Sequence, residues 1–140
     1  MKKGTDSLLR IAQTYGTPVY VYEQSGIEEQ CQKLLKHFPG VVFHYAMKAN
    51  SNPEMLKVIR KHGIGVEAVS LGELSLAASA GFKTKDTSFT CASLTEEELS
   101  AAAKTGARVH LDSLTQLETW GRHALGREVS LRLNQGIGAG

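Results

Sequence analysis

The chain has 140 residues, of which 41% are hydrophobic and 21% charged, with a formal net charge of +2. This composition is that of an ordinary globular domain, and it excludes both a disordered chain and a strong field of one sign, so we expect no nucleic-acid partner. No apolar stretch approaches the roughly 18 residues of a membrane span, and no amino-terminal stretch resembles a signal peptide.

Cysteine and histidine usage adds two expectations. Cys31 and Cys91 lie far apart without a CxxC spacing, which favours a reduced, cytoplasmic setting. None of the histidines is spaced from another His, Cys or carboxylate as metal ligands on one helix face are, so we expect no metal site.

The first part of the chain predicts a helix and a strand that precede the main domain. Asp6 or Ser7 would cap a helix that ends at Gly16, and residues 17–22 alternate as a short strand does. We therefore expect residues 1–24 to form a separate unit. A second helix is predicted from about residue 25 to residue 37.

From residue 41 onward, predicted strands and helices alternate. The strands are expected at residues 41–47, 65–69, 87–91, 107–111 and 128–133, and helices follow all but the last. Such alternation indicates right-handed βαβ units and a parallel sheet, and sustained repetition of one unit favours a closed (β/α)8 TIM barrel. A complete barrel needs about 250 residues. We therefore expect an α/β fold in which residues 25–140 form a partial barrel, about the first five βα units.

Lys48 stands where the apolar run 41–47 gives way to turn residues. Side chains alternate along a strand, so His44, Ala46 and Lys48 would point into the barrel, with Lys48 at the carboxyl end where catalytic groups of such barrels lie. A partly desolvated lysine there is suited to a Schiff base with an aldehyde. The alternative is a solvated lysine that ends a strand. For His44 an interior histidine is the more common role.

Two segments carry a family resemblance. Residues 45–50, Tyr-Ala-Met-Lys-Ala-Asn, and residues 65–74, which begin Gly-Val-Glu-Ala-Val-Ser, resemble consecutive motifs of the fold-type III decarboxylases that use pyridoxal 5'-phosphate. The resemblance implies that Lys48 forms the internal aldimine with this cofactor and later returns a proton to the substrate carbon. It also implies that Glu67, Glu73 and Arg132 lie near the cofactor. Most members carry aspartate at the position of Glu67, so its contact stays open.

The resemblance further implies a homodimeric enzyme that acts on a small amino acid. The most similar members convert meso-2,6-diaminopimelate to L-lysine and CO2, while carboxynorspermidine, ornithine and arginine are alternative substrates. Residues 1–24 would join a carboxy-terminal β-domain beyond Gly140, so the chain alone is expected to be inactive. Two other hypotheses for the function are a non-catalytic barrel that binds pyridoxal phosphate and a barrel fragment without cofactor.

Overall fold

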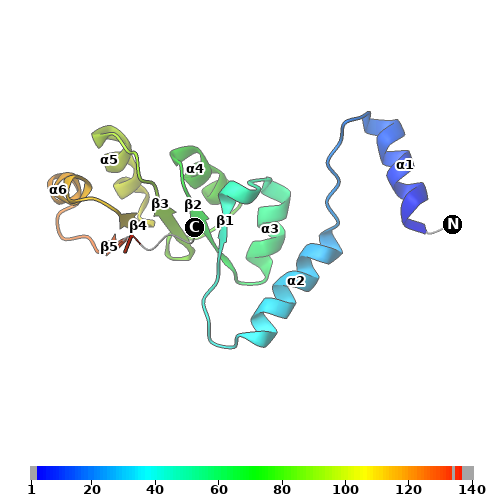
Figure 1. Cartoon of the computed structure of the whole chain (residues 1–140), viewed down its shortest axis with the longest axis horizontal. Helices are drawn as coiled ribbons and strands as arrows, with labels where there is room; N and C mark the ends of the chain where they lie inside the picture. The colour runs from blue at the N-terminus through cyan, green and yellow to red at the C-terminus, as the bar shows by residue number, and fades with distance from the viewer. Residues whose placement is uncertain (1–2, 134, 137–140) are drawn as a thin grey trace.

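The computed structural model describes residues 3–133 and 135–136. Its α-helices are α1 (Lys3–Tyr15), α2 (Gln24–His37), α3 (Pro53–Lys61), α4 (Leu71–Ser79), α5 (Glu96–Thr105) and α6 (Leu114–His123). Two short 3-10 helices are η1 (Met47–Ala49) and η2 (Thr84–Asp86). The strands are β1 (His44–Ala46), β2 (Gly65–Ala68), β3 (Thr87–Thr90), β4 (Arg108–Leu111) and β5 (Ser130–Leu131), as Figure 1 shows.

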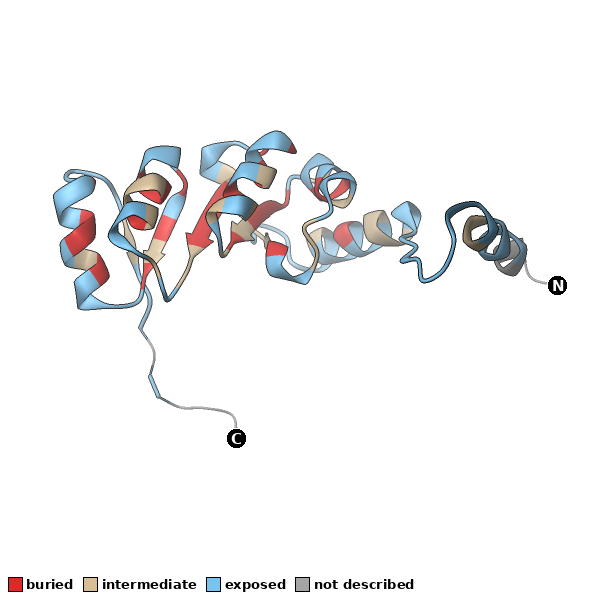
Figure 2. Ribbon diagram, turned by 90° about the horizontal axis from the view of Figure 1, so that it is seen from above, coloured by how far each residue is buried: buried red, intermediate tan, exposed pale blue. Residues whose placement is uncertain are grey.

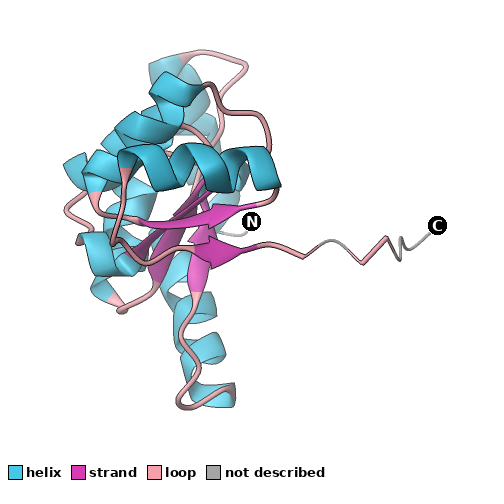
Figure 3. Cartoon of the chain, turned by 90° about the vertical axis from the view of Figure 1, so that its left-hand side faces the viewer, coloured by secondary structure: helices cyan, strands magenta, loops and turns pink. Residues whose placement is uncertain are grey.

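The five strands form one parallel sheet whose spatial order follows the chain order. Each strand therefore lies beside the next, joined by a helical crossover, as in the first part of a (β/α)8 barrel. Helices α3 to α6 lie on one side of the strands, and the opposite side is free of helices in the part of the chain that the structure describes (Figure 3). The predicted partial barrel is confirmed.

The main core lies between the sheet and its helices. Its largest fully buried side chains are Phe89, Met47, Leu56, Leu99, Leu111, Val66 and Val109. Buried residues are concentrated in the strands and on the helix faces turned toward them (Figure 2). Because side chains alternate along a strand, core positions such as Val66 and Ala68 leave Glu67 between them on the open side of the sheet.

The structure corrects the prediction for the amino-terminal segment. Residues 17–22 form no strand, because no other strand among the described residues lies beside them to take up their backbone hydrogen bonds. Tyr20 is 88% exposed. Helix α1 begins by Lys3, before the predicted caps Asp6 and Ser7, and its apolar residues Leu8 and Leu9 are exposed. This segment extends away from the sheet (Figure 1).

The outer strands are shorter than predicted. β1 begins at His44 rather than at residue 41, because its partner β2 begins at Gly65, which is level with His44. β5 contains only Ser130 and Leu131, which pair with β4 and have no described strand on their other side. Asn134 and residues 137–140, which follow β5 in the chain, lie outside the described residues.

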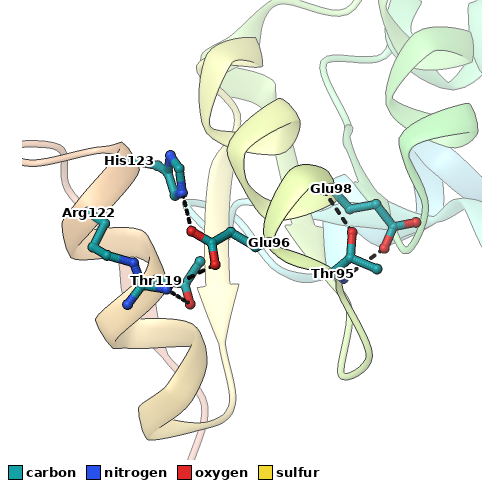
Figure 4. A network of polar contacts seen from close by, with 6 residues as sticks. All are labelled: Thr95, Glu96, Glu98, Thr119, Arg122 and His123. Carbon is teal, nitrogen blue, oxygen red and sulfur yellow. Dashed lines mark hydrogen bonds and ion pairs between the residues drawn. The ribbon is translucent and has the colours of Figure 1, made fainter.

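A capping box begins α5. The Thr95 hydroxyl accepts a hydrogen bond from the Glu98 amide at 3.2 Å, and the Glu98 carboxylate accepts one from the Thr95 amide at 2.9 Å (Figure 4). The next residue, Glu96, accepts hydrogen bonds from Arg122 at 3.1 Å and from His123 at 2.7 Å. These contacts join α5 to α6. Within the described ranges, no helix is long and apolar enough to cross a membrane.

Candidate functional site

A polar pocket of about 560 Å³ opens on the helix-free side of the sheet. Its lining residues come from all five strands or from the turns that follow them: His44, Lys48, Glu67, Ser88, Thr90, Arg108, His110 and Arg132. The pocket brings together three of the four predicted site residues, Lys48, Glu67 and Arg132. Two arginines and a lysine face a single carboxylate among these lining residues, so the pocket favours an anionic ligand.

Lys48 lies in the turn η1, two residues beyond the end of β1. Met47, which is 1% exposed, anchors this turn in the core. The Tyr45 hydroxyl donates a hydrogen bond to the Asn50 carbonyl oxygen at 3.2 Å and so closes the turn around the lysine. Burial raises the pKa of Tyr45, although the Asn50 contact opposes the shift, so the hydroxyl remains a proton donor at neutral pH.

The expected desolvation of Lys48 is not observed, because its side chain is exposed. The described residues build only one wall of the pocket, since the sheet carries no layer on its open side. The turn therefore presents the lysine to the pocket without covering it.

Glu67 is held by the neighbouring strand. The Thr90 hydroxyl of β3 donates a hydrogen bond to Glu67 Oε1 at 2.8 Å. Glu67 is half-buried, between the core residues Val66 and Ala68. The sequence did not indicate which group Glu67 contacts; in the structure this group is the Thr90 hydroxyl on the neighbouring strand.

Two histidines line the pocket. His44 Nδ1 lies 3.2 Å from both the Val66 carbonyl oxygen and Ser88 Oγ. These contacts hold the half-buried ring against β2 and β3. Burial lowers the pKa of His110; the charge of Glu67 opposes this shift, while Arg108 and His44 add to it.

The other two predicted residues differ in position. Arg132 follows β5, its amide donates to the Leu111 carbonyl oxygen at 2.7 Å, and its side chain lines the pocket. Glu73 does not line the pocket. Its carboxylate accepts a hydrogen bond from the Val69 amide at 2.7 Å, and its own amide donates to Ser70 Oγ at 3.2 Å, so it fixes the turn into α4.

Four lining residues were not predicted: Ser88, Thr90, Arg108 and His110. The signal for them is the alternation along β3 and β4, where Phe89 and Val109 enter the core and polar residues stand on either side. Among the described residues, no group of three His, Cys, Asp or Glu side chains could hold a metal ion.

Comparison with known proteins gives one consistent result. Residues 24–140 match the family model described as "Pyridoxal-dependent decarboxylase, pyridoxal binding domain". The diaminopimelate decarboxylase of Methanothermobacter thermautotrophicus is 36% identical over 98% of this chain and 33% of its own length. The corresponding protein of Escherichia coli K12 is 34% identical over 96% of this chain and 32% of its own length.

A solved structure agrees with these sequence matches. Diaminopimelate decarboxylase from Helicobacter pylori, complexed with L-lysine, superposes with a TM-score of 0.80 at 29% identity, over 91% of this chain and 34% of that one. The present chain therefore spans about a third of the length of the relatives it matches.

Proposed function

Since this chain belongs to the family of pyridoxal-dependent decarboxylases, whose cofactor is pyridoxal 5'-phosphate, we propose that Lys48 is the residue that binds this cofactor covalently. The observation that carries the proposal is that Lys48, Glu67 and Arg132, predicted from separate parts of the sequence, line one pocket. Catalytic groups of barrel enzymes lie at this carboxyl end of the strands.

The residues of the pocket fit such a cofactor by their chemistry. Lys48 supplies the primary amine that condenses with an aldehyde, with release of water. Arg108 and Arg132 supply positive charge for an anionic ligand or a substrate carboxylate. When bound, the cofactor provides the electron sink that makes loss of CO2 from an amino acid feasible.

The roles of the remaining residues follow from their positions. Once the substrate amine has replaced it, the Lys48 amine would carry the proton that is returned to the substrate carbon. Glu67 would hold that amine in place by its negative charge, and Arg132 would orient the lysine from the far strand. Glu73 would act indirectly, by stabilising the turn that follows β2 through its hydrogen bond with the Val69 amide.

For the whole protein we propose decarboxylation of meso-2,6-diaminopimelate to L-lysine and CO2 by a cytoplasmic homodimer. The support is that the curated relatives matched over nearly the whole chain are diaminopimelate decarboxylases. In this account residues 1–24 join a carboxy-terminal β-domain, and residues 25–140 begin the barrel. Ornithine, arginine and carboxynorspermidine remain alternative substrates, because the residues that line the pocket do not by themselves distinguish these amino acids from diaminopimelate.

The substrate assignment is tested by CO2 release from the full-length protein that carries this chain, with cofactor added. We expect release from diaminopimelate to exceed that from ornithine, arginine or lysine, and to be lost in Lys48→Ala. Faster release of CO2 from ornithine or arginine would identify that amino acid as the substrate instead of diaminopimelate. Cofactor binding without release from any amino acid would instead favour a non-catalytic pyridoxal phosphate-binding protein.

A further inference from the structure

The hydrogen bond between Thr90 and Glu67 directs a carboxylate along the sheet. In the register of the strands, Glu67 is level with Ala46 on one side and Ser88 on the other. Lys48 lies two residues beyond Ala46, and Thr90 lies two residues beyond Ser88. Because Glu67 bonds to Thr90 rather than to Ser88, its carboxylate leans toward the carboxyl end of the sheet, the end at which Lys48 stands.

The hydrogen bond from Thr90 leaves one oxygen of the Glu67 carboxylate available to accept a hydrogen bond from a ligand. A hydroxyl that donates to an ionised carboxylate makes a charge-assisted hydrogen bond, which is stronger than one between neutral groups. Thr90 uses only Oε1 of Glu67. Among the described residues, Oε2 makes no hydrogen bond, so it is free to accept one from an amine in the pocket.

The contact also limits where the carboxylate can turn. Arg108, Arg132 and Lys48 all line the same pocket, and a mobile glutamate could pair with any of them. An aspartate, whose carboxylate is about 1.5 Å closer to its backbone, would lie farther from Thr90. The longer side chain and the threonine therefore work as a pair.

We propose that Thr90 is a positioning residue that holds the Glu67 carboxylate toward the amine of Lys48. This inference rests on the proposed function, because it assigns Thr90 a role in binding the cofactor at that lysine. It adds a residue of β3 to the site, one that itself need not touch the cofactor.

The test uses the full-length protein and follows the dissociation constant for pyridoxal 5'-phosphate, the absorbance of the bound cofactor and borohydride labelling of Lys48. Thr90→Val keeps the shape of the side chain but removes the hydroxyl, and Thr90→Ser keeps the hydroxyl. We expect Thr90→Val to weaken cofactor binding by about tenfold or more and to change the absorbance bands, as loss of a charge-assisted hydrogen bond predicts. Thr90→Ser should stay within about twofold of the wild type.

A double-mutant cycle separates positioning from a general effect on the fold. In a Glu67→Leu background, which has no carboxylate to hold, Thr90→Val should cause no further loss. The same loss in both backgrounds, or wild-type binding and spectra in Thr90→Val, would overturn the inference while leaving the proposed function intact. Failure of the wild type to bind the cofactor would overturn both. Circular dichroism and thermal unfolding establish that each variant is folded.

Discussion

The Glu73 carboxylate accepts a hydrogen bond from the Val69 amide at 2.7 Å, across the turn between β2 and α4. Sequence resemblance places Glu73 near the cofactor, whereas this contact gives it a role in the local backbone. A buried or half-buried amide without an acceptor is costly, so the two roles predict different consequences of a substitution.

We predict that Glu73→Ala lowers the free energy of unfolding by about 1–2 kcal/mol and leaves borohydride labelling of Lys48 within about threefold of the wild type. Glu73→Gln, whose amide oxygen can still accept from Val69, should lose less stability. Urea unfolding and peptide mapping measure the two effects. Loss of labelling with unchanged stability would instead place Glu73 in contact with the cofactor.

A second prediction concerns the network that joins α5 to α6 (Figure 4). The hydrogen bond from His123, and next that from Arg122, lower the pKa of Glu96 below its ordinary value of 4.5. The folded protein then binds fewer protons at Glu96 than the unfolded chain does. The contribution of the Glu96 contacts to the free energy of unfolding is therefore present at pH values above 4.5, and it is lost as the pH falls through the lower pKa of the folded state.

The difference in unfolding free energy between wild type and Glu96→Gln should therefore shrink as the pH falls below 4.5. Urea unfolding at each pH measures this difference, and comparison with one variant removes the effects of the other carboxylates. A difference that is constant across this range would contradict the assignment.

A third prediction concerns Gly65, where the backbone of β2 passes close to its neighbours. A Cβ atom at this position would lie 2.6 Å from the Asp86 carbonyl oxygen and 3.1 Å from His44 Cε1. We predict that Gly65→Ala destabilises the protein by about 1–3 kcal/mol, as overpacking does.

Gly121 in α6 is the matched control, because a Cβ there would meet no heavy atom within 4 Å. Gly121→Ala should stabilise the protein by about 0.5–1 kcal/mol through helix propensity. Thermal or urea unfolding compares the two variants. If both changed stability in the same direction, the close approach at Gly65 would not be the cause.

A fourth prediction concerns the charge balance of the pocket. The pKa of His110 lies below its ordinary value of 6.5, mainly because the ring is partly buried. The negative charge of Glu67 opposes this shift, and the positive charge of Arg108 adds to it. Glu67→Gln should therefore lower the pKa of His110 further, and Arg108→Leu should raise it. NMR titration of the His110 ring measures these shifts, with His110→Asn to assign the signal. Shifts of the opposite sign would mean that these groups do not share the pocket as described.

The parts of the fold that could be predicted are those fixed by local pattern. β2, β3 and β4 each follow a glycine or a turn and place alternate apolar residues in the core, so their type and order were evident from the sequence. Residues 17–22 show a comparable pattern but form no strand, because a strand also needs a neighbour, which local sequence does not reveal.

The site could be predicted only where one residue carries distinctive chemistry. Lys48 was found because a lysine that follows an apolar run is unusual, and Arg132 was found through the family resemblance. Thr90 and His110 carry no such signal alone. They become site residues because Thr90 hydrogen-bonds to Glu67 on the neighbouring strand and the register of the sheet places His110 level with Thr90, which depends on pairing between strands distant in the sequence.

The proposed function depends on covalent binding of the cofactor by Lys48. The direct measurement is borohydride reduction of the full-length protein after incubation with pyridoxal 5'-phosphate, followed by peptide mapping, with absorbance recorded between roughly 330 and 430 nm. We expect one absorbing adduct, on the peptide that contains Lys48, which is lost in Lys48→Arg but kept in Lys57→Arg, a substitution of an exposed lysine on α3. No adduct, or label spread evenly over surface lysines, would contradict it.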